Sequence, residues 1–252
     1  MSKGVFRQLL TIFFFLPIGL FGQFSQLQLD CSTVLLMNAK TGGIVFEKKG
    51  YELCYPASLT KIATALYVLD SRVDLDQMCL ARADELVRVT EYDKMLQLDT
   101  IPPHQLETNA VHMYIKDQEV LPLRNLLEGH IMSSACDASN VIAQNLHGSV
   151  EDFMQHLNAY LQKKGYPNTQ LLNPNGLHHP AHYSTPLELA RMFKETLKFP
   201  CFRHWIQSTH YFRPKTNKQP AKKMFQINRL VKKGRYYYPK ALGGKTGYHK
   251  QA

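Results

Sequence analysis

A change of hydrophobic periodicity at Ser58 constrains the fold of this chain more than any other feature. Before it, residues 32–39 and 43–49 are rich in strand-forming side chains and are joined by Lys40-Thr41-Gly42-Gly43, which predicts a β-hairpin. After it, apolar residues recur at helical spacing, namely Leu59, Ile62, Ala63, Leu66 and Leu69. An amphipathic helix that begins near Ser58 is therefore expected.

Helical patterns continue through the middle of the chain. They cover residues 121–132, 137–146 before Gly148, and 150–164 before Gly165, with glycine placed as a helix stop. A further helix is expected from Thr185-Pro186 to about residue 197, because a hydroxyl cap precedes proline at the first helical position.

Strand-like pieces return near the end of the chain, at residues 225–231 and 241–249. Strands at both ends around a helical middle predict an α+β fold, with an antiparallel sheet and a mainly helical subdomain. The first and last strands are expected to be neighbours in that sheet.

The N-terminus differs from the rest in composition. Lys3 and Arg7 precede an apolar run over residues 9–22, which has the length of a signal-peptide core and is short for a membrane span. We expect residues 1–25 to be a signal peptide or an uncleaved N-terminal anchor, and residues 26–252 to form one domain. Export from the cytoplasm follows from this prediction.

Charge is concentrated at the other end. Of the 30 Lys and Arg residues, 13 lie from Cys201 onward, where there is no Asp or Glu, whereas the first 200 residues carry 17 basic and 20 acidic side chains. Such a segment indicates an anionic partner, which could be nucleic acid, a membrane surface or an acidic polymer, or else a solvated sheet edge. The five cysteines lack C-x-x-C spacing, so they indicate neither a zinc site nor a disulfide framework.

Ser58 and Lys61 are three positions apart at the expected start of a helix. Positions at this spacing share a helix face, so the hydroxyl and the amine can meet. Burial and the positive helix end both lower a lysine pKa, and a neutral amine could take the serine proton. The helix end would also favour an oxyanion near Ser58. A capping serine beside a surface lysine is the ordinary alternative.

Two companion motifs favour the catalytic interpretation. Residues 133–140 read SSACDASN between two expected helices, and Gly244-Lys245-Thr246-Gly247 lies on an expected strand. In this order the motifs resemble the S-x-x-K, S-x-N and K-T-G signature of penicillin-binding proteins and serine β-lactamases. Their separations, and the segments around them from residue 32 to 250, are most similar to the low-molecular-weight D-alanyl-D-alanine carboxypeptidases.

The resemblance implies a fold of the penicillin-binding-protein type and a two-step acyl transfer without a cofactor or a metal. Ser58 would be the nucleophile, Lys61 its base, and Ser134 a proton relay to the leaving amine. Lys245 and Thr246 in the K-T-G strand, with Gly247, would hold the terminal carboxylate, and the backbone N–H groups of Ser58 and Tyr248 would form the oxyanion hole. The substrate would be a peptidoglycan stem peptide that ends in D-Ala-D-Ala, and β-lactams would be covalent inhibitors.

The sequence departs from this family at two places. Cys136 stands where the S-x-N motif has asparagine, and a thiol is the weaker hydrogen-bonding group. Only five residues follow Gly247, so the C-terminal strands of the family are expected to be missing. This fits a fragment, a truncated reading frame, or a protein that is shorter than its relatives. The alternative to an enzyme is a binding protein: a catalytically impaired relative that binds peptidoglycan or partner proteins. A serine β-lactamase is less favoured, because neither S-D-N nor an acidic deacylation loop is found.

Three other features are expected to be structural. The second K-T-G, at Lys40-Thr41-Gly42, lies in the hairpin turn. His178, His179 and His182 lack the companion ligands of a metal site and are expected in a polar loop. Tyr236-Tyr237-Tyr238 beside basic residues could stack on nucleic acid, but in an exported chain we expect a strand near the active site, and no nucleic acid as partner.

Overall fold

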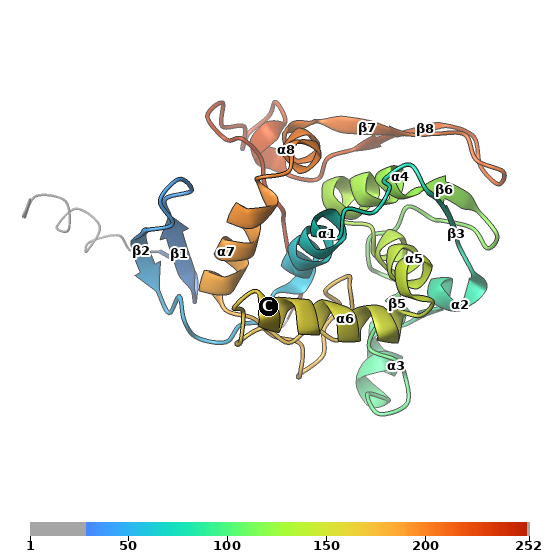
Figure 1. The fold of residues 1–252 in the computed structure, drawn as a ribbon, viewed down its shortest axis with the longest axis horizontal. Helices are drawn as coiled ribbons and strands as arrows, with labels where there is room; N and C mark the ends of the chain where they lie inside the picture. Colours follow the sequence, from blue (N-terminus) through green and yellow to red (C-terminus); the bar gives the residue numbers. More distant parts are fainter. Residues whose placement is uncertain (1–28, 251–252) are drawn as a thin grey trace, which may run out of the picture. The chain divides into compact units, whose positions relative to one another are not determined.

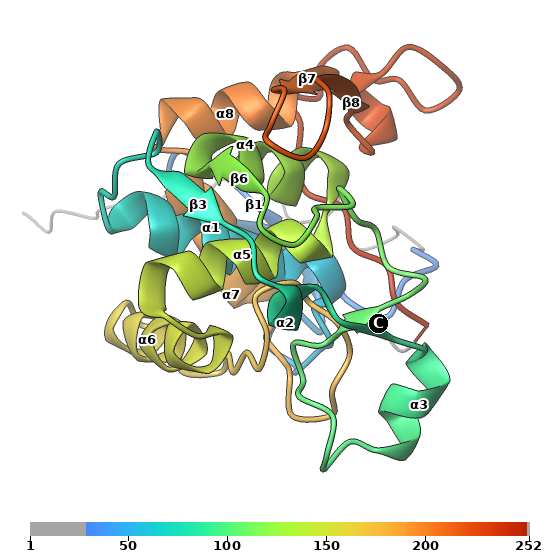
Figure 2. The same cartoon turned by 90° about the vertical axis from the view of Figure 1, so that its right-hand side faces the viewer.

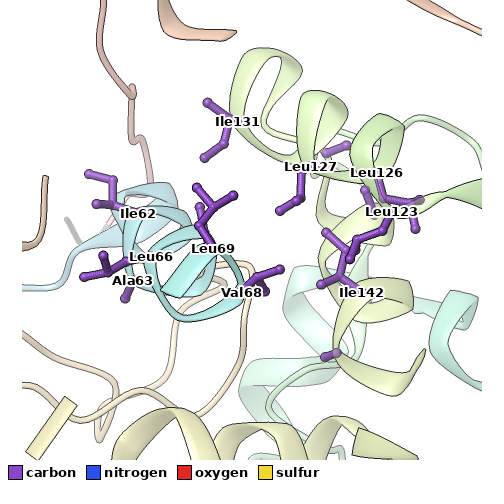
Figure 3. Packing of buried hydrophobic residues seen from close by; sticks show 14 of the residues in the cluster. Ile62, Ala63, Leu66, Val68, Leu69, Leu123, Leu126, Leu127, Ile131 and Ile142 are labelled. Carbon is purple, nitrogen blue, oxygen red and sulfur yellow. The ribbon is translucent and has the colours of Figure 1, made fainter. Parts of the chain in front are cut away.

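Helix α1 (Thr60–Asp70) lies at the centre of the helical part of the molecule. The computed structural model describes residues 29–250, and in it α1 is buried on almost every side, polar residues included. Ile62, Leu66 and Leu69 pack in the main hydrophobic cluster with side chains of α4 and the turn after it, as Figure 3 shows. Each fully buried side chain of this size contributes about 1.5–3 kcal/mol through burial.

The other helices of the described residues are α2 (Ala83–Leu86), α3 (Glu91–Leu96), α4 (Leu123–Glu128), α5 (Cys136–His147), α6 (Val150–Lys163), α7 (Pro186–Thr196) and α8 (Pro200–Gln207). Helices α6 and α7 lie beside α1, whereas α2 and α3 lie further out (Figure 1). Single turns of 3-10 helix occur at η1 (Ala57–Leu59) and η3 (Arg229–Val231), and a π-turn, η2 (Gly129–Ser133), joins α4 to the α5 region. Helix α1 contacts α6, α7, η1 and η2, so the start of α1 is held from several sides.

The strands of the described residues form four separate pairs. β1 (Val34–Met37) pairs with β2 (Ile44–Lys48), and β3 (Met78–Leu80) with β6 (Val120–Pro122), both antiparallel. β4 (Arg88–Val89) runs parallel to β5 (Leu106–Glu107). β7 (His210–Arg213) and β8 (Lys222–Phe225) form an antiparallel ribbon that lies beside α8 and α4 in both views (Figures 1 and 2).

Several sequence predictions are confirmed. The β1–β2 hairpin forms around the predicted turn, where the Gly42 N–H donates to the Asn38 carbonyl at 2.7 Å. Helices α5 and α6 match the expected segments, and the Thr185 hydroxyl caps α7 by accepting from the Glu188 N–H at 3.2 Å. The segment 121–132 is helical only in part, because β6 extends to Pro122 before α4 begins.

The two strands predicted near the end of the chain, at residues 225–231 and 241–249, were wrong. Residues 225–231 are mostly outside strands, because the Asn228 side chain accepts from the Leu230 N–H and starts η3 instead. Residues 241–249 form no strand, and β1 pairs only with β2 among the described strands. Gly243 and Gly244 have φ values of +130° and +158°, and a Cβ on Gly243 would lie 2.1 Å from the Ile206 carbonyl oxygen. This segment therefore packs against the end of α8.

The expected signal peptide or anchor lies outside the described residues. Within residues 29–250, no helix combines the length and the apolar character needed to cross a lipid bilayer. Contacts group Thr33–Ala252 into one unit, which contains every motif discussed below.

Candidate active site

Ser58 lies in η1, the tight turn that leads into α1. The Leu59 N–H donates to the Pro56 carbonyl at 3.0 Å, and Ala57 has a φ of +45°, a left-handed value that is unusual for a residue with a Cβ. The side chain of Ser58 is partly exposed and lines a cleft. A strained turn that presents a hydroxyl to a cleft is typical of a nucleophile.

Lys61 is fully buried one turn further along the chain. Its Nζ lies 3.2 Å from Ser58 Oγ, 2.5 Å from the Asn175 carbonyl oxygen and 3.5 Å from Cys136 Sγ. Burial lowers the pKa of Lys61, against an opposite effect of Cys136 and Asp137. A neutral amine has two N–H donors, which match the carbonyl and the sulfur, and its lone pair is then free to accept the Ser58 proton.

The charge of the Asp137 carboxylate acts on Lys61, but its oxygens make their hydrogen bonds elsewhere. They accept hydrogen bonds from the backbone N–H groups of Met113, Ile115 and Ala138 at 2.9–3.1 Å. Among the described residues no ion pair to Lys61 is present, so Asp137 raises the pKa of Lys61 only through its charge and not through a direct contact.

Ser134 and Lys245 form a second hydroxyl–amine pair in the same region. Lys245 Nζ donates to Ser134 Oγ at 2.8 Å and to the Thr246 carbonyl at 2.5 Å. Ser134 ends the π-turn η2 with a φ of +63°, which turns its hydroxyl toward Lys245. Burial, followed by the charge of Lys61, lowers the pKa of Lys245 well below its usual value. An incoming carboxylate would counter both effects and restore the charge.

The predicted site residues therefore come together around one cleft. Its lining includes Ser58, Ser134, Cys136, Thr246, Gly247 and Tyr248. A Cβ on Gly247 would lie 3.2 Å from the Pro56 carbonyl oxygen, so the K-T-G segment runs directly past the turn that carries Ser58, although it is not a strand. The Tyr248 side chain is exposed. That its N–H completes an oxyanion hole with the N–H of Ser58 stays a prediction.

Two residues that support the site, Asn175 and Gly176, were assigned no role from the sequence. The Asn175 carbonyl accepts from Lys61, and its side chain is fixed by Asn140 Oδ1 at 3.0 Å and by the Leu177 N–H at 3.0 Å. Gly176 has a φ of +84°, and a Cβ there would lie 1.9 Å from the Ala57 carbonyl oxygen. The only sequence signal is the Asn-Pro-Asn-Gly turn at 173–176, which indicates a turn but no contact with Lys61.

Two buried histidines fix the first turn of α1. His130 Nε2 lies 3.0 Å from the Lys61 carbonyl oxygen, and His182 Nε2 lies 2.8 Å from Thr60 Oγ1. Burial lowers the pKa of His182 to about 3, so this ring is neutral at pH 7. His178 instead stacks on His249, with ring centroids 5.1 Å apart. In residues 29–250 no group of three or more ligating side chains could hold a metal ion.

Tyr236, Tyr237 and Tyr238 are exposed and lie outside the described strands, so the strand predicted there was wrong. The Tyr238 N–H donates to the Leu230 carbonyl at 3.0 Å, which holds this segment in a turn after η3.

Comparison with known proteins identifies the family. Residues 22–252 match the family model described as D-alanyl-D-alanine carboxypeptidase. The chain belongs to this family. Among curated relatives, it is 29% identical to the D-alanyl-D-alanine carboxypeptidase DacF of Bacillus subtilis, over 90% of this chain and 53% of the relative. It is 26% identical to DacA of Haemophilus influenzae, over 89% and 52%. The chain thus spans about half the length of these carboxypeptidases.

Solved structures show the same fold. The DD-transpeptidase of Streptomyces K15 superposes with a TM-score of 0.71 at 24% identity, over 86% of this chain and 80% of that one. A D-alanyl-D-alanine carboxypeptidase from Mycobacterium tuberculosis gives 0.71 at 23% identity, over 87% and 74%. The predicted α+β fold of the penicillin-binding-protein type is therefore confirmed.

Cys136→Asn is expected to keep or raise the rate of Ser58 acylation. Cys136 is buried, but its sulfur faces Lys61 Nζ at the edge of the cleft, and an amide offers stronger hydrogen bonds at nearly the same reach. The measurements are the labelling rate with a fluorescent penicillin and the melting temperature. Cys79→Asn is the matched control, because Cys79 is buried in the apolar core, where an unpaired amide costs about 1–3 kcal/mol. A folded Cys136→Asn protein that no longer labels would show that the thiol itself is needed.

Proposed function

We propose that this protein is an exported serine D-Ala-D-Ala carboxypeptidase that acts on peptidoglycan stem peptides. The contact between Ser58 Oγ and the buried Lys61 amine, at 3.2 Å, carries the proposal. Lys61 has a lowered pKa and no ion pair within the described residues, so it is suited to accept a proton rather than to hold a charge. The family's name supports the substrate class.

The proposed reaction has two steps. Ser58 Oγ attacks the carbonyl carbon of the terminal D-Ala-D-Ala bond while its proton passes to Lys61 Nζ. The tetrahedral intermediate then breaks its C–N bond, and D-alanine leaves as an amine that takes a proton through Ser134. Water adds to the resulting ester, and Ser58 is released with the shortened peptide.

The cleft offers groups for the other parts of the substrate. Lys245 and Thr246 would bind the terminal carboxylate, because a charged amine and a hydroxyl both donate hydrogen bonds to carboxylate oxygens. The N–H groups of Ser58 and Tyr248 would hold the oxyanion as charge develops on it. A β-lactam places its strained amide in the same position, so it would acylate Ser58 and remain attached.

Export and location are part of the proposal. The basic N-terminus and apolar run predict a signal peptide or anchor. The substrate lies in the cell wall, so the periplasm or the outer face of the cytoplasmic membrane is the proposed location, with the membrane surface as a further partner. The sequence has neither an S-D-N triplet nor an acidic deacylation loop, which favours this carboxypeptidase over a serine β-lactamase.

The test is labelling of the intact protein with a fluorescent penicillin, together with release of D-alanine from a D-Ala-D-Ala peptide. We expect one label per chain, located by mass spectrometry on the peptide that contains Ser58, and D-alanine release that needs Ser58. Folded protein that neither labels nor releases D-alanine would overturn the proposal in favour of an impaired binding protein. Rapid hydrolysis of the penicillin, without peptide turnover, would favour a β-lactamase.

A further inference from the structure

The β7–β8 ribbon exposes aromatic and basic side chains on one face. Phe212 lies opposite Lys223, and His210 lies opposite Phe225, so all four point to the same side of the ribbon. Phe212 and Phe225 are 62% and 60% exposed, which is unusual for two phenylalanines. Lys223 Nζ lies between them, 5.8 Å and 5.7 Å from the ring centroids. We call His210, Phe212, Lys223 and Phe225 the outer face.

The opposite face fixes the ribbon to the active site. Tyr211 is buried, and its hydroxyl lies 2.8 Å from Ser133 Oγ, next to Ser134. Beyond β8, the Ile227 N–H donates to the Met132 carbonyl at 3.0 Å, and Ile227 lines the cleft that contains Ser58. Only one residue separates Phe225 from Ile227. The outer face is therefore joined through a short, hydrogen-bonded path to the wall of the cleft.

The surroundings of the outer face are cationic. Lys215 and Lys218 lie in the loop between β7 and β8, which Figure 1 shows at the end of the ribbon, and Lys222 begins β8. Glu119 contacts this loop, but it is buried and accepts hydrogen bonds from Thr216 and Gln219, so its charge faces inward. Asp117, in the turn whose Gln118 carbonyl accepts from Asn217 of this loop, is exposed and opposes this positive charge.

We propose that the outer face binds the glycan–peptide polymer of peptidoglycan beside the stem peptide that is being cleaved. This inference rests on the proposed function. Sugar rings present apolar faces that can lie on Phe212 and Phe225, and the carboxylates of neighbouring stem peptides complement Lys223 and the loop lysines. The link to the cleft wall through Ile227 favours this polymer over other anionic partners, because a polymeric substrate extends beyond the stem peptide held in the cleft.

The test compares polymeric and small substrates with the full chain. For Phe212→Ala/Phe225→Ala we expect about tenfold weaker binding to insoluble peptidoglycan and a similar fall in D-alanine release from it, which corresponds to about 1.4 kcal/mol. Release from a soluble D-Ala-D-Ala peptide and the penicillin labelling rate should not change, because neither probe reaches the ribbon. Tyr51→Ala/Met78→Ala removes two exposed apolar side chains elsewhere and should affect none of the four measurements.

Three results would overturn the inference. Unchanged binding to peptidoglycan would remove the outer face as a docking surface. An equal loss with the soluble peptide would show that the substitutions damage the site itself. Binding of anionic phospholipid vesicles or single-stranded DNA that falls with the same variant, while peptidoglycan binding stays, would assign the face to another partner. If the parent fails to label with penicillin, the proposed function fails, whereas the binding comparison still tests the ribbon.

Discussion

Lys61→Ala is expected to lower the rate of Ser58 acylation by about 10²–10⁴-fold, the range that a positioned general base contributes. The amine contacts Ser58 Oγ at 3.2 Å, and no other base is seen within hydrogen-bonding distance of that oxygen among the described residues. Ser58→Ala should abolish covalent labelling entirely, because it removes the bond-forming atom. Labelling kinetics with a fluorescent penicillin measure both effects.

A second variant separates chemistry from folding. Lys61→Met keeps the length of the side chain in a fully buried site, but it leaves the Asn175 carbonyl without its donor. We expect this protein to remain folded, with a melting temperature nearer the parent's than that of Lys61→Ala, and to acylate as slowly as Lys61→Ala. Labelling of Lys61→Met at the parent's rate would show that the base is another group.

The pH profile of the parent tests the same assignment. Burial lowers the pKa of Lys61, so the fraction of neutral amine grows as pH rises through that lowered value. Acylation should therefore fail in acid and rise toward neutral pH. For substrates with a terminal carboxylate, binding should weaken as pH rises through the pKa of Lys245, because the neutral amine attracts the carboxylate less strongly. A flat profile from acid to neutral pH would contradict a lysine base.

The sequence was sufficient for the parts of the site that depend on local order. Ser58 and Lys61 are three positions apart where the helical period begins, and the Thr185-Pro186 cap marks the start of α7, so local spacing placed both features. The two companion motifs were needed to favour a catalytic role for Ser58 and Lys61. The backbone conformation of residues 241–249 depends instead on contacts with segments distant in sequence, such as the end of α8. We predicted a strand there, but Gly243 and Gly244 have φ values of +130° and +158°, which differ from those of a regular strand.

Contacts made by backbone groups also could not be predicted from the sequence. The Asn175 carbonyl completes the shell around Lys61, yet every residue has a carbonyl, so no side-chain pattern identifies it. The phenylalanines of the outer face were missed for another reason. Residues 210–213 and 222–225 are short strands, and their pairing register decides which side chains share a face.

The second large effect is expected at Gly176, where Gly176→Ala should lower the acylation rate about 10²-fold or more. Its φ of +84° costs an alanine about 1–2 kcal/mol, and the new Cβ would lie 1.9 Å from the Ala57 carbonyl oxygen, so one of the two segments must move. Ala57 precedes the nucleophile, and a displacement of about 1 Å at a reacting group costs about 10²-fold in rate. The measurements are the labelling rate and the melting temperature.

Gly165→Ala provides a matched control for the backbone strain in this prediction. Gly165 has the same φ of +84°, but nothing lies within 4 Å of the Cβ that alanine would add. Gly165→Ala should therefore lower the melting temperature through the left-handed conformation alone and leave the labelling rate of the folded protein unchanged. The difference between the two variants measures how strongly the contact between residues 176 and 57 positions Ser58. Equal labelling rates in both folded variants would mean that the turn tolerates the displacement, and that Ser58 is positioned by α1 and Lys61 instead.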